Sequence, residues 1–221
     1  MIYRNRPFRW ASHNPILESS IKVFSPKKAI ELGMGFNSTP LLKKNIPFLV
    51  SVDHDRLWFK KVVEEIPRSD SFIPLFFDVG DDITRKNLQD TIPEDTIQKC
   101  KKFYKKLIKK YRKIDLLFID QYAGFRFLAL TSMYKNVDII VFHDTHESQH
   151  YGYDGFYSNY DLSDFYSFRY LLKGCGTDIL IRRSIVKENL KRWKRSLRYY
   201  GQKFCNRFET SFEYKLKGKE K

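Results

Sequence analysis

The sequence has only three cysteines in 221 residues, Cys100, Cys175 and Cys205. Their odd number and wide spacing match neither a disulfide framework nor a zinc motif. No run of apolar residues approaches the 18 or so that suggest a membrane-spanning helix. The first ten residues are charged and lack the apolar core of a signal peptide. These absences predict a globular protein of a reducing cytoplasm, with no membrane span.

Acidic residues are scarce in two stretches of the chain, whose net charge is +15. Residues 99–113 hold nine Lys or Arg and no acid, and residues 182–221 hold fourteen against four acids. Such segregation favours an anionic partner, either nucleic acid, a phosphorylated substrate or a membrane surface. Two solvated helix faces would produce the same pattern, so the sequence leaves both interpretations open.

The sequence does contain a strand, loop and helix signature at residues 28–40. A short apolar run predicts a buried parallel strand. Gly33 and Gly35 then allow a tight turn and a close approach of the backbone to a ligand. Ser38 or Thr39 is expected to cap the following helix. A third glycine, as in dinucleotide-binding loops, is missing, which argues against a pyrophosphate cofactor.

This stretch resembles the first motif of the class I S-adenosylmethionine-dependent methyltransferases. The resemblance implies that its residues bind the cofactor: Glu31, Gly33, Gly35, Ser38 and Thr39. Asp53 closes the second predicted strand 22 positions after Glu31, where a carboxylate accepts from both hydroxyls of a ribose. Helix capping is the alternative role for Asp53. His54 is expected to flank the adenine, and the resemblance places Asp78 in contact with it.

Hydrophobic periodicity predicts alternating strands and helices. The predicted strands cover 28–32, 48–52, 72–77, 114–119, 137–142, 178–181 and 211–216. Helices are expected at 39–44, 58–66, 97–111, 126–135, 162–172 and 189–204, with a loop at 148–160. Such alternation requires right-handed crossovers and a mostly parallel sheet covered on both faces. We therefore expect a Rossmann-like α/β fold of seven strands, with the last strand antiparallel as the resemblance implies.

No repeat or linker divides the chain, so residues 1–221 are expected to form one methyltransferase domain. Residues 1–27 would be an N-terminal segment that either covers the cofactor or packs on the sheet. Residues 28–217 would form the Rossmann-like core, and residues 218–221 a short tail.

Four predicted strands end in acids, which are Asp53, Asp78, Asp120 and Asp144. Ligands of an open parallel sheet bind outside the carboxyl ends of its strands. If the strands before Asp120 and Asp144 are neighbours, the two strand ends lie about 4.8 Å apart. Two such carboxylates repel each other unless a cation lies between them, and Mg²⁺ is the expected ion. The alternative is a metal-free site in which His143 or Asp144 is the general base.

The pair Asp120 and Asp144, with His143, resembles the metal site of catechol-type and sugar-modifying O-methyltransferases. The sequence lacks the Asn/Asp-Pro-Pro-Tyr motif of methyltransferases that act on amino groups of DNA bases. We therefore expect methylation of a hydroxyl on a small molecule or sugar, with the tyrosines of 151–160 lining the acceptor pocket. His143, His146 and His150 lie within eight residues, with Glu147 among them, and a zinc or iron site with hydrolase chemistry is the alternative there. The sequence favours a general-base role for a histidine of this cluster.

Three alternatives use the same signature. A nucleic-acid methyltransferase would hold phosphates on its basic stretches and stack bases on neighbouring aromatic rings. Those rings would be Phe103, Tyr104, Trp193, Tyr199, Tyr200 and Phe204. A non-catalytic binding protein, or another nucleotide enzyme of Rossmann type, would keep the fold.

Overall fold

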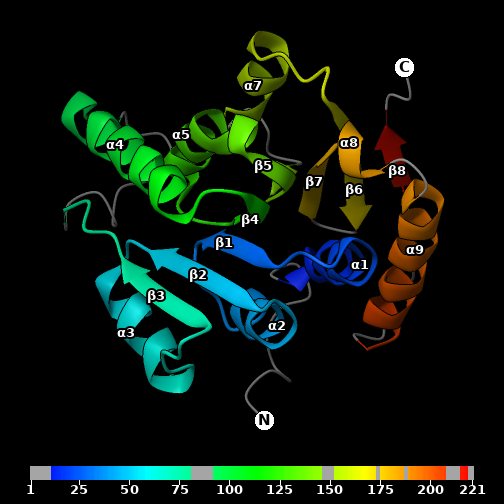
Figure 1. Cartoon of the computed structure of the whole chain (residues 1–221), viewed down its shortest axis with the longest axis horizontal. Helices are drawn as coiled ribbons and strands as arrows, with labels where there is room; N and C mark the ends of the chain where they lie inside the picture. The colour runs from blue at the N-terminus through cyan, green and yellow to red at the C-terminus, as the bar shows by residue number, and fades with distance from the viewer. Residues whose placement is uncertain are drawn as a thin grey trace.

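The computed structural model describes residues 11–80, 92–145, 152–172, 175–186, 189–207 and 215–218. In these residues eight strands form one sheet in the order β3-β2-β1-β4-β5-β7-β6-β8 (Figure 1). The strands are β1 (Lys28–Leu32), β2 (Phe48–Asp53), β3 (Phe72–Phe76), β4 (Ile114–Ile119), β5 (Val137–His143), β6 (Phe165–Leu172), β7 (Cys175–Arg182) and β8 (Lys215–Gly218). The first five are parallel, whereas β7 pairs antiparallel with both β5 and β6.

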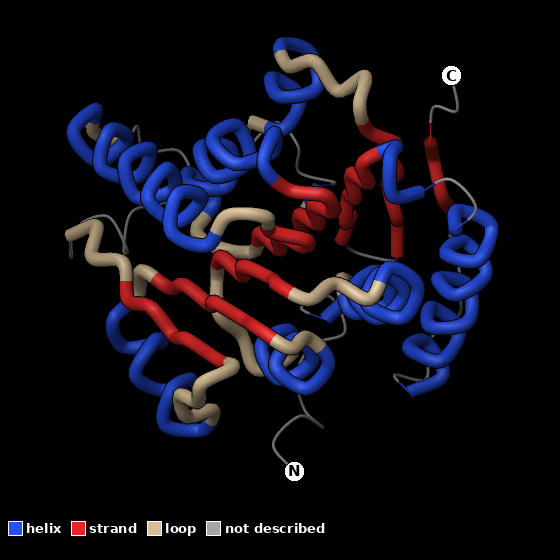
Figure 2. The backbone as a smooth tube through the Cα atoms, viewed as in Figure 1, coloured by secondary structure: helices blue, strands red, loops and turns tan. Residues whose placement is uncertain are grey.

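Helices cover both faces of the sheet (Figure 2). On one face lie α4 (Glu94–Tyr111), α5 (Ala123–Met133) and α7 (Tyr153–Asn159), and on the other lie α1 (Asn14–Phe24), α2 (Ser38–Asn45), α3 (Arg56–Glu65) and α9 (Asn189–Arg207). A short 3₁₀ helix, η3 (Tyr134–Asn136), and the one-turn α8 (Arg183–Val186) complete the described helices.

The buried strands are apolar along nearly their whole length because each contacts a helical layer on both sides. In β4, Leu117 and Ile119 pack with α4 and α5, whereas Leu116 and Phe118 pack against the opposite layer. The same alternation continues through β5. The predicted α/β fold with a mostly parallel, doubly covered sheet is therefore confirmed.

Two local predictions near the antiparallel edge are wrong. Residues 162–172, expected to be helical, contain strand β6, and the loop expected at 148–160 contains helix α7. In β6, Phe168 and Tyr170 are buried while Arg169 between them is partly exposed. Aromatic residues with this alternation favour a strand, and pairing with β7 along the whole of β6 decides the outcome.

Because β6 was not among the seven predicted strands, the described sheet has eight strands. β1 to β7 follow the order 3-2-1-4-5-7-6, and β8 extends that sheet by pairing antiparallel with β6. Residues 211–214 of the predicted last strand lie outside the described residues.

The order of strands places a site at one edge. β1 has β2 on one side and β4 on the other, so the chain direction of the crossovers reverses between β1 and β4. Leu32 pairs with Ile119, and Ile119 pairs with Phe142. The loops that begin at Gly33, Asp120 and Asp144 therefore leave the sheet side by side.

Candidate functional site

The glycine loop, residues 33–37, contacts the two neighbouring strands at its first glycine, Gly33. Gly33 has a φ of +95°, which a residue with a side chain rarely adopts. Its amide donates to the carbonyl of Val52 at 2.8 Å. A Cβ at Gly33 would overlap the backbone of Asp120 and Gln121, whereas one at Gly35 would meet only the Ser38 hydroxyl, at 3.4 Å. Gly33 is thus required by the fold, and Gly35 keeps the outer side of the loop open.

Glu31 supports this loop from beneath. It is fully buried, and its Oε2 accepts from Thr39 Oγ1 at 2.8 Å and from Ser51 Oγ at 2.5 Å. Thr39 Oγ1 in turn accepts from the amide of Gly35 at 2.9 Å. Burial raises the pKa of Glu31 to about 7, although nearby hydroxyls lower it. Glu31 and Thr39 thus set the shape of the loop.

The predicted helix cap is wrong by one or two residues. Helix α2 begins at Ser38, so Asn37 takes the N-cap position and Ser38 and Thr39 lie within the first turn. Both side chains are buried. They therefore belong to the support of the glycine loop, and their contact with a cofactor remains a prediction.

Asp53, the last residue of β2, braces the other side of the loop. Its Oδ2 accepts from the amide of Met34 at 2.9 Å and its Oδ1 from the amide of Asp55 at 2.9 Å. The residue is 5% exposed, and burial raises the pKa of its carboxyl to about 7. Asp55, not Asp53, caps α3, because its Oδ1 accepts from the amide of Trp58 at 2.9 Å. The capping alternative for Asp53 is thereby removed.

His54 and Asp78 lie in different environments. His54 is largely buried against Phe125, and its Nδ1 has no hydrogen-bond partner. Burial lowers the pKa of His54 to about 4. Asp78 is exposed after β3, where its Oδ2 lies 3.4 Å from the Arg56 guanidinium. Neither arrangement tests the predicted contacts with adenine.

The two carboxylates at the ends of β4 and β5 are joined by an arginine. Arg126 donates to Asp120 Oδ1 and to Asp144 Oδ2, each at 3.0 Å. It also donates to the carbonyls of Gln121 and His143. The His143 Nδ1 lies 3.2 Å from Asp120 Oδ1 and 3.4 Å from Asp144 Oδ1. The structure thus brings the predicted reacting residues together.

This network sets the charge of Asp120. Burial opposes ionisation, but His143 and Arg126 outweigh it and hold the pKa of the carboxyl at about 2. Asp120 is therefore an anion at neutral pH.

Asp144 lies in a strained turn. Its φ is +60°, in the left-handed region that Asp tolerates better than most residues. The next residue, Thr145, is buried and donates to Asp178 Oδ1 at 2.7 Å. Asp178 also accepts from Tyr157 at 2.6 Å and from Arg169 at 2.8 Å. This buried network holds the turn that directs the Asp144 carboxylate toward Arg126 and His143.

The arrangement does not fit Mg²⁺ between Asp120 and Asp144. The sequence predicts a cation beside these two carboxylates. In the structure that cation is the guanidinium of Arg126, which bridges them. An ion in that position would have to displace a buried arginine that makes four hydrogen bonds. We therefore derive no step through Mg²⁺ at this pair.

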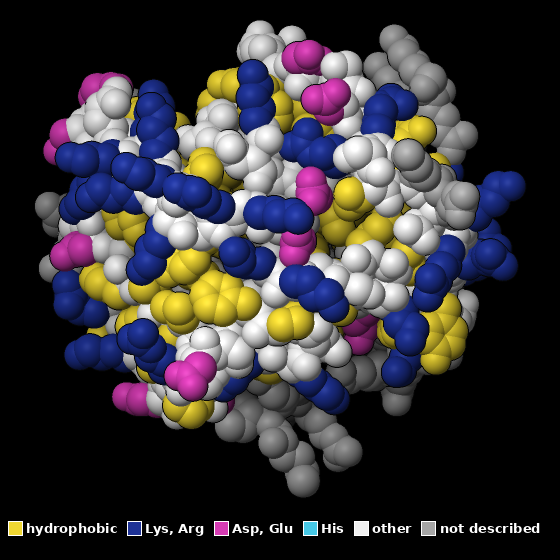
Figure 3. All heavy atoms as spheres, in the orientation of Figure 1, with side chains coloured by type: hydrophobic (Ala, Val, Ile, Leu, Met, Phe, Trp, Pro, Cys, Tyr) yellow, Lys and Arg dark blue, Asp and Glu magenta, His cyan; other side chains and the backbone are white. Residues whose placement is uncertain are grey.

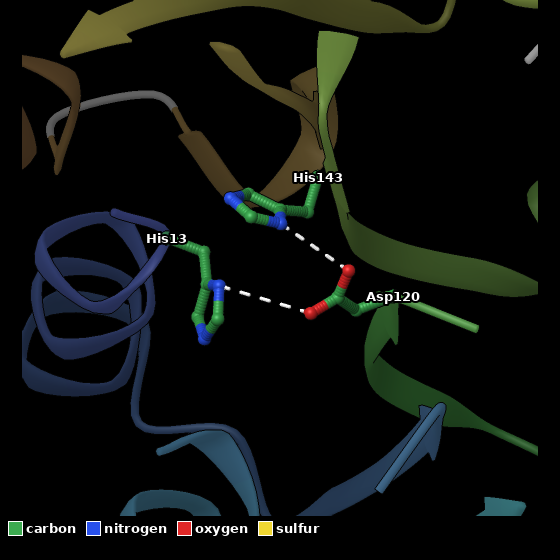
Figure 4. A group of neighbouring side chains, drawn as sticks. All are labelled: His13, Asp120 and His143. Carbon is green, nitrogen blue, oxygen red and sulfur yellow. Dashed lines mark hydrogen bonds and ion pairs between the residues drawn. The ribbon is translucent and has the colours of Figure 1, made fainter. Parts of the chain in front are cut away.

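Sequence reasoning missed both Arg126 and His13. The available signal for Arg126 was an arginine in the first turn of the otherwise apolar helix α5. His13 is the N-cap of α1 and is 1% exposed beside Phe118 and His143. Figure 4 shows His13, Asp120 and His143 pointing toward one another. No spacing in the sequence relates His13 to residues more than 100 positions away.

The expected acceptor pocket of tyrosines is wrong for at least one of them. Tyr153 is fully buried, with its hydroxyl donating to the carbonyl of His143 at 3.2 Å. Tyr160 packs against Phe156 and Tyr134. Tyr151, and the predicted metal residues His146, Glu147 and His150, lie outside the described residues.

The basic residues of α4 form one face of that helix. Thr96, Cys100, Tyr104, Leu107 and Tyr111 are buried on the opposite side. The exposed face carries a lysine row lining a shallow hollow with Gln98: Lys101, Lys102, Lys105, Lys106 and Lys109. Figure 3 shows these cationic side chains gathered over α4.

Most of the aromatic rings expected to stack on bases are buried or already pack against other side chains. Phe103 stacks on Phe77 with centroids 4.0 Å apart, and Tyr104 and Trp193 are fully buried. Of the six predicted rings, Tyr199 is the one that is largely exposed, at 62%.

Comparison with solved structures identifies the fold. The N-methyltransferase NodS from Bradyrhizobium japonicum WM9, in complex with S-adenosylhomocysteine, matches with a TM-score of 0.53 and 12% identity. The match covers 81% of this chain and 89% of NodS. An rRNA methylase from Streptococcus thermophilus matches with a TM-score of 0.50 and 12% identity, over 82% of this chain and 98% of that one. The chain therefore has the Rossmann-like fold of class I methyltransferases, as predicted.

No known sequence family matches the chain, and no curated protein is similar to it in sequence. No helix in the described part of the chain combines the length and apolar character needed to cross a membrane.

Proposed function

We propose that this chain is an S-adenosylmethionine-dependent O-methyltransferase that acts on a hydroxyl of a small molecule or sugar. The observation that supports this most directly is the contact between Gly33 and the backbone of Asp120. It joins the candidate cofactor loop to the candidate reacting centre at the point where the strand order reverses. One ligand bound at that edge of the sheet would reach both.

The residues at this edge of the sheet are of the chemical types that would bind the cofactor. Gly35 leaves the outer side of the loop open. Each carboxylate oxygen of Asp53 accepts one backbone amide, and a carboxylate oxygen can accept a second hydrogen bond. His54 Nδ1 and Glu31 Oε1 are buried without hydrogen-bond partners. We propose that Gly33, Gly35 and Asp53 hold the cofactor, with His54 and Asp78 toward the adenine and Glu31, Ser38 and Thr39 shaping the loop. When bound, the cofactor supplies a methyl group already activated on a sulfonium.

The chain then has to orient the acceptor and take up one proton. We propose Asp144 for the proton, because its side chain is 21% exposed whereas that of His143 is 4% exposed. Arg126 and His143 hold the carboxylate in place from behind. Asp120, which is 23% exposed, would orient the acceptor hydroxyl beside Asp144.

Calorimetry with S-adenosylhomocysteine tests the cofactor site. We expect micromolar binding to the wild-type protein and a loss of roughly 1–3 kcal/mol in Asp53→Ala, from the missing hydrogen bonds to the ribose. Gly35→Val should abolish binding by filling the open side of the loop while leaving the fold intact. Gly33→Val is a poor test, because its side chain would clash with the backbone of Asp120. A wild-type protein that does not bind would contradict the proposal.

A nucleic-acid methyltransferase is the second candidate, supported by the lysine row on α4. The burial of Phe103, Tyr104 and Trp193 removes most of the rings that would stack on bases, which leaves phosphate contacts alone. Phosphate contacts carry no sequence information, so we expect RNA binding to be weak and nonspecific.

A further inference from the structure

The described residues contain one group of candidate metal-binding side chains that shares only Asp120 with the predicted Mg²⁺ pair. It consists of His13, Asp120 and His143, whose candidate donor atoms all lie within 4.8 Å of one another. They come from three elements, namely the start of α1 and the ends of β4 and β5. Figure 4 shows the two imidazole rings directed at the two oxygens of the carboxylate between them.

His13 is the least explained member of this group. It is 1% exposed, and neither of its ring nitrogens has a hydrogen-bond partner. Its Nδ1 lies 4.0 Å from Asp120 Oδ2, too far for a hydrogen bond. Buried polar groups are nearly always paired, so an imidazole with two unpaired nitrogens, aimed at a carboxylate, indicates a missing partner.

The surroundings are those of a metal ligand set. The other ring nitrogen of His143, Nε2, lies 2.9 Å from Ser12 Oγ, the kind of outer hydrogen bond that orients a ligating histidine. Arg126 holds Asp120 through Oδ1, so Oδ2 faces His13. His143 and Asp120 are therefore each oriented by an outer hydrogen bond, and the guanidinium contacts the carboxylate on the side away from His13.

We propose that His13, Asp120 and His143 bind one divalent transition-metal ion of the zinc and iron(II) class. Two imidazoles and one carboxylate favour such an ion over Mg²⁺, which prefers oxygen ligands. Three protein ligands leave a position open for water or an acceptor oxygen, as in catalytic zinc sites.

The required movement is small. Zn²⁺ bonds of about 2.0–2.1 Å place tetrahedral ligand atoms roughly 3.3 Å apart, so the group must contract by about 1.5 Å at its widest. No hydrogen bond of the His13 ring opposes this rotation. His143 is already held beside the carboxylate, with its Nδ1 3.2 Å from the other oxygen of Asp120, Oδ1.

Two of the three ligands belong to the reacting centre proposed above. A catalytic role of the ion therefore rests on the proposed methyl transfer, whereas binding of the ion does not. In that role the ion would polarise the acceptor hydroxyl and lower its pKa.

Titration of metal-free protein with Zn²⁺, and with Co²⁺ as a spectroscopic probe, tests the site. We expect one ion per chain, with visible Co²⁺ absorption of a low-coordinate site. His13→Phe keeps a ring against Phe118 but removes both nitrogens, and should weaken binding by more than about 100-fold, since losing even an outer partner costs about 10–100-fold. The comparison variant Asp144→Asn removes a ligand of the alternative Asp120 and Asp144 site. It should weaken Zn²⁺ binding by less than about tenfold, an effect allowed for because Asp144 shares Arg126 with Asp120 and lies 3.4 Å from His143 Nδ1.

Histidine NMR on the wild-type protein makes the test independent of variant folding. Zn²⁺ should shift the ring signals of His13 and His143 and leave those of His54 unchanged. The proposal is overturned if no ion binds, if His13→Phe binds Zn²⁺ as tightly as the wild type, or if Mg²⁺ binds in preference and Asp144→Asn abolishes it. S-adenosylhomocysteine binding, measured on the same metal-free sample, reports separately on the methyltransferase proposal.

Discussion

Arg126 is the residue on which the reacting centre depends most. Its side chain is 8% exposed and contacts both Asp120 and Asp144. Asp120 and Asp144 each lie within 3.4 Å of His143 Nδ1, so their negative charges are close together. Without the guanidinium these charges would repel each other in a partly buried site.

We expect Arg126→Met to lower the free energy of unfolding by about 2–4 kcal/mol at pH 7, because it leaves two carboxylates unpaired. Urea unfolding measures this loss. The double variant Arg126→Met with Asp144→Asn should recover part of the stability by removing one of the charges. Equal stability of the wild type and Arg126→Met would show that the network contributes nothing.

The burial of Glu31 makes the free energy of unfolding depend on pH. The pKa of Glu31 is about 7 in the folded chain and 4.5 in its ordinary state, so the folded state retains a proton that the unfolded chain releases between these values. Stability from this group is therefore lost as the pH rises from about 4.5 to 7.

We expect Glu31→Gln to remove this loss, which is on the order of 3 kcal/mol. Relative to the wild type, the variant should become steadily more stable between about pH 4.5 and 7 and gain little above pH 7, as measured by urea unfolding at each pH. Asp53 titrates over the same range but is present in both proteins. Parallel pH profiles would mean that Glu31 is ionised throughout.

Helix α4 has one apolar face, which is buried, and one basic face, which is exposed. Its buried face packs against the sheet, and its lysine row faces solvent. The charge of residues 99–113 is therefore compatible with the solvated-face interpretation, and only a binding experiment separates it from an anion-binding surface.

We expect single-stranded RNA to bind α4 weakly, through phosphates alone. The double variant Lys105→Gln with Lys109→Gln should reduce the slope of log K against log salt by about 1.4, since each phosphate contact contributes about 0.7. Stability should change by no more than about 0.5 kcal/mol. Lys22→Gln, on the exposed side of α1, is the control that keeps the slope. Nanomolar RNA binding at about 150 mM salt would instead favour the nucleic-acid methyltransferase.

For the whole molecule, the proposed cofactor site predicts which ligand stabilises the fold. At a concentration of 100 Kd, S-adenosylhomocysteine should add about 2.7 kcal/mol to the free energy of unfolding. This corresponds to an increase in Tm of roughly 5–10 °C for a chain of this size. NAD⁺ is the matched control, because the missing third glycine argues against a pyrophosphate ligand. Stabilisation by NAD⁺ and not by S-adenosylhomocysteine would favour another nucleotide enzyme.

The sequence by itself determined the parallel half of the sheet and what lies at its edge. Predominantly apolar segments of five to seven residues form β1, β2, β4 and β5, because a strand covered on both faces has no side that faces solvent. Asp53 ends β2, and Gly33, Asp120 and Asp144 directly follow β1, β4 and β5. These residues share one edge because the carboxyl ends of parallel strands lie together. Their grouping was predictable without knowing any helix.

Tertiary structure decided which cation and which histidines meet there. Arg126 reaches Asp120 and Asp144 because α5 packs on one face of the sheet, and His13 reaches Asp120 because α1 begins on the other. Strand β6 was likewise fixed by pairing with β7, against a helical interpretation of the same residues. Contacts of this kind depend on how helices and edge strands dock, and sequence periodicity specifies which face is buried but not what it is buried against.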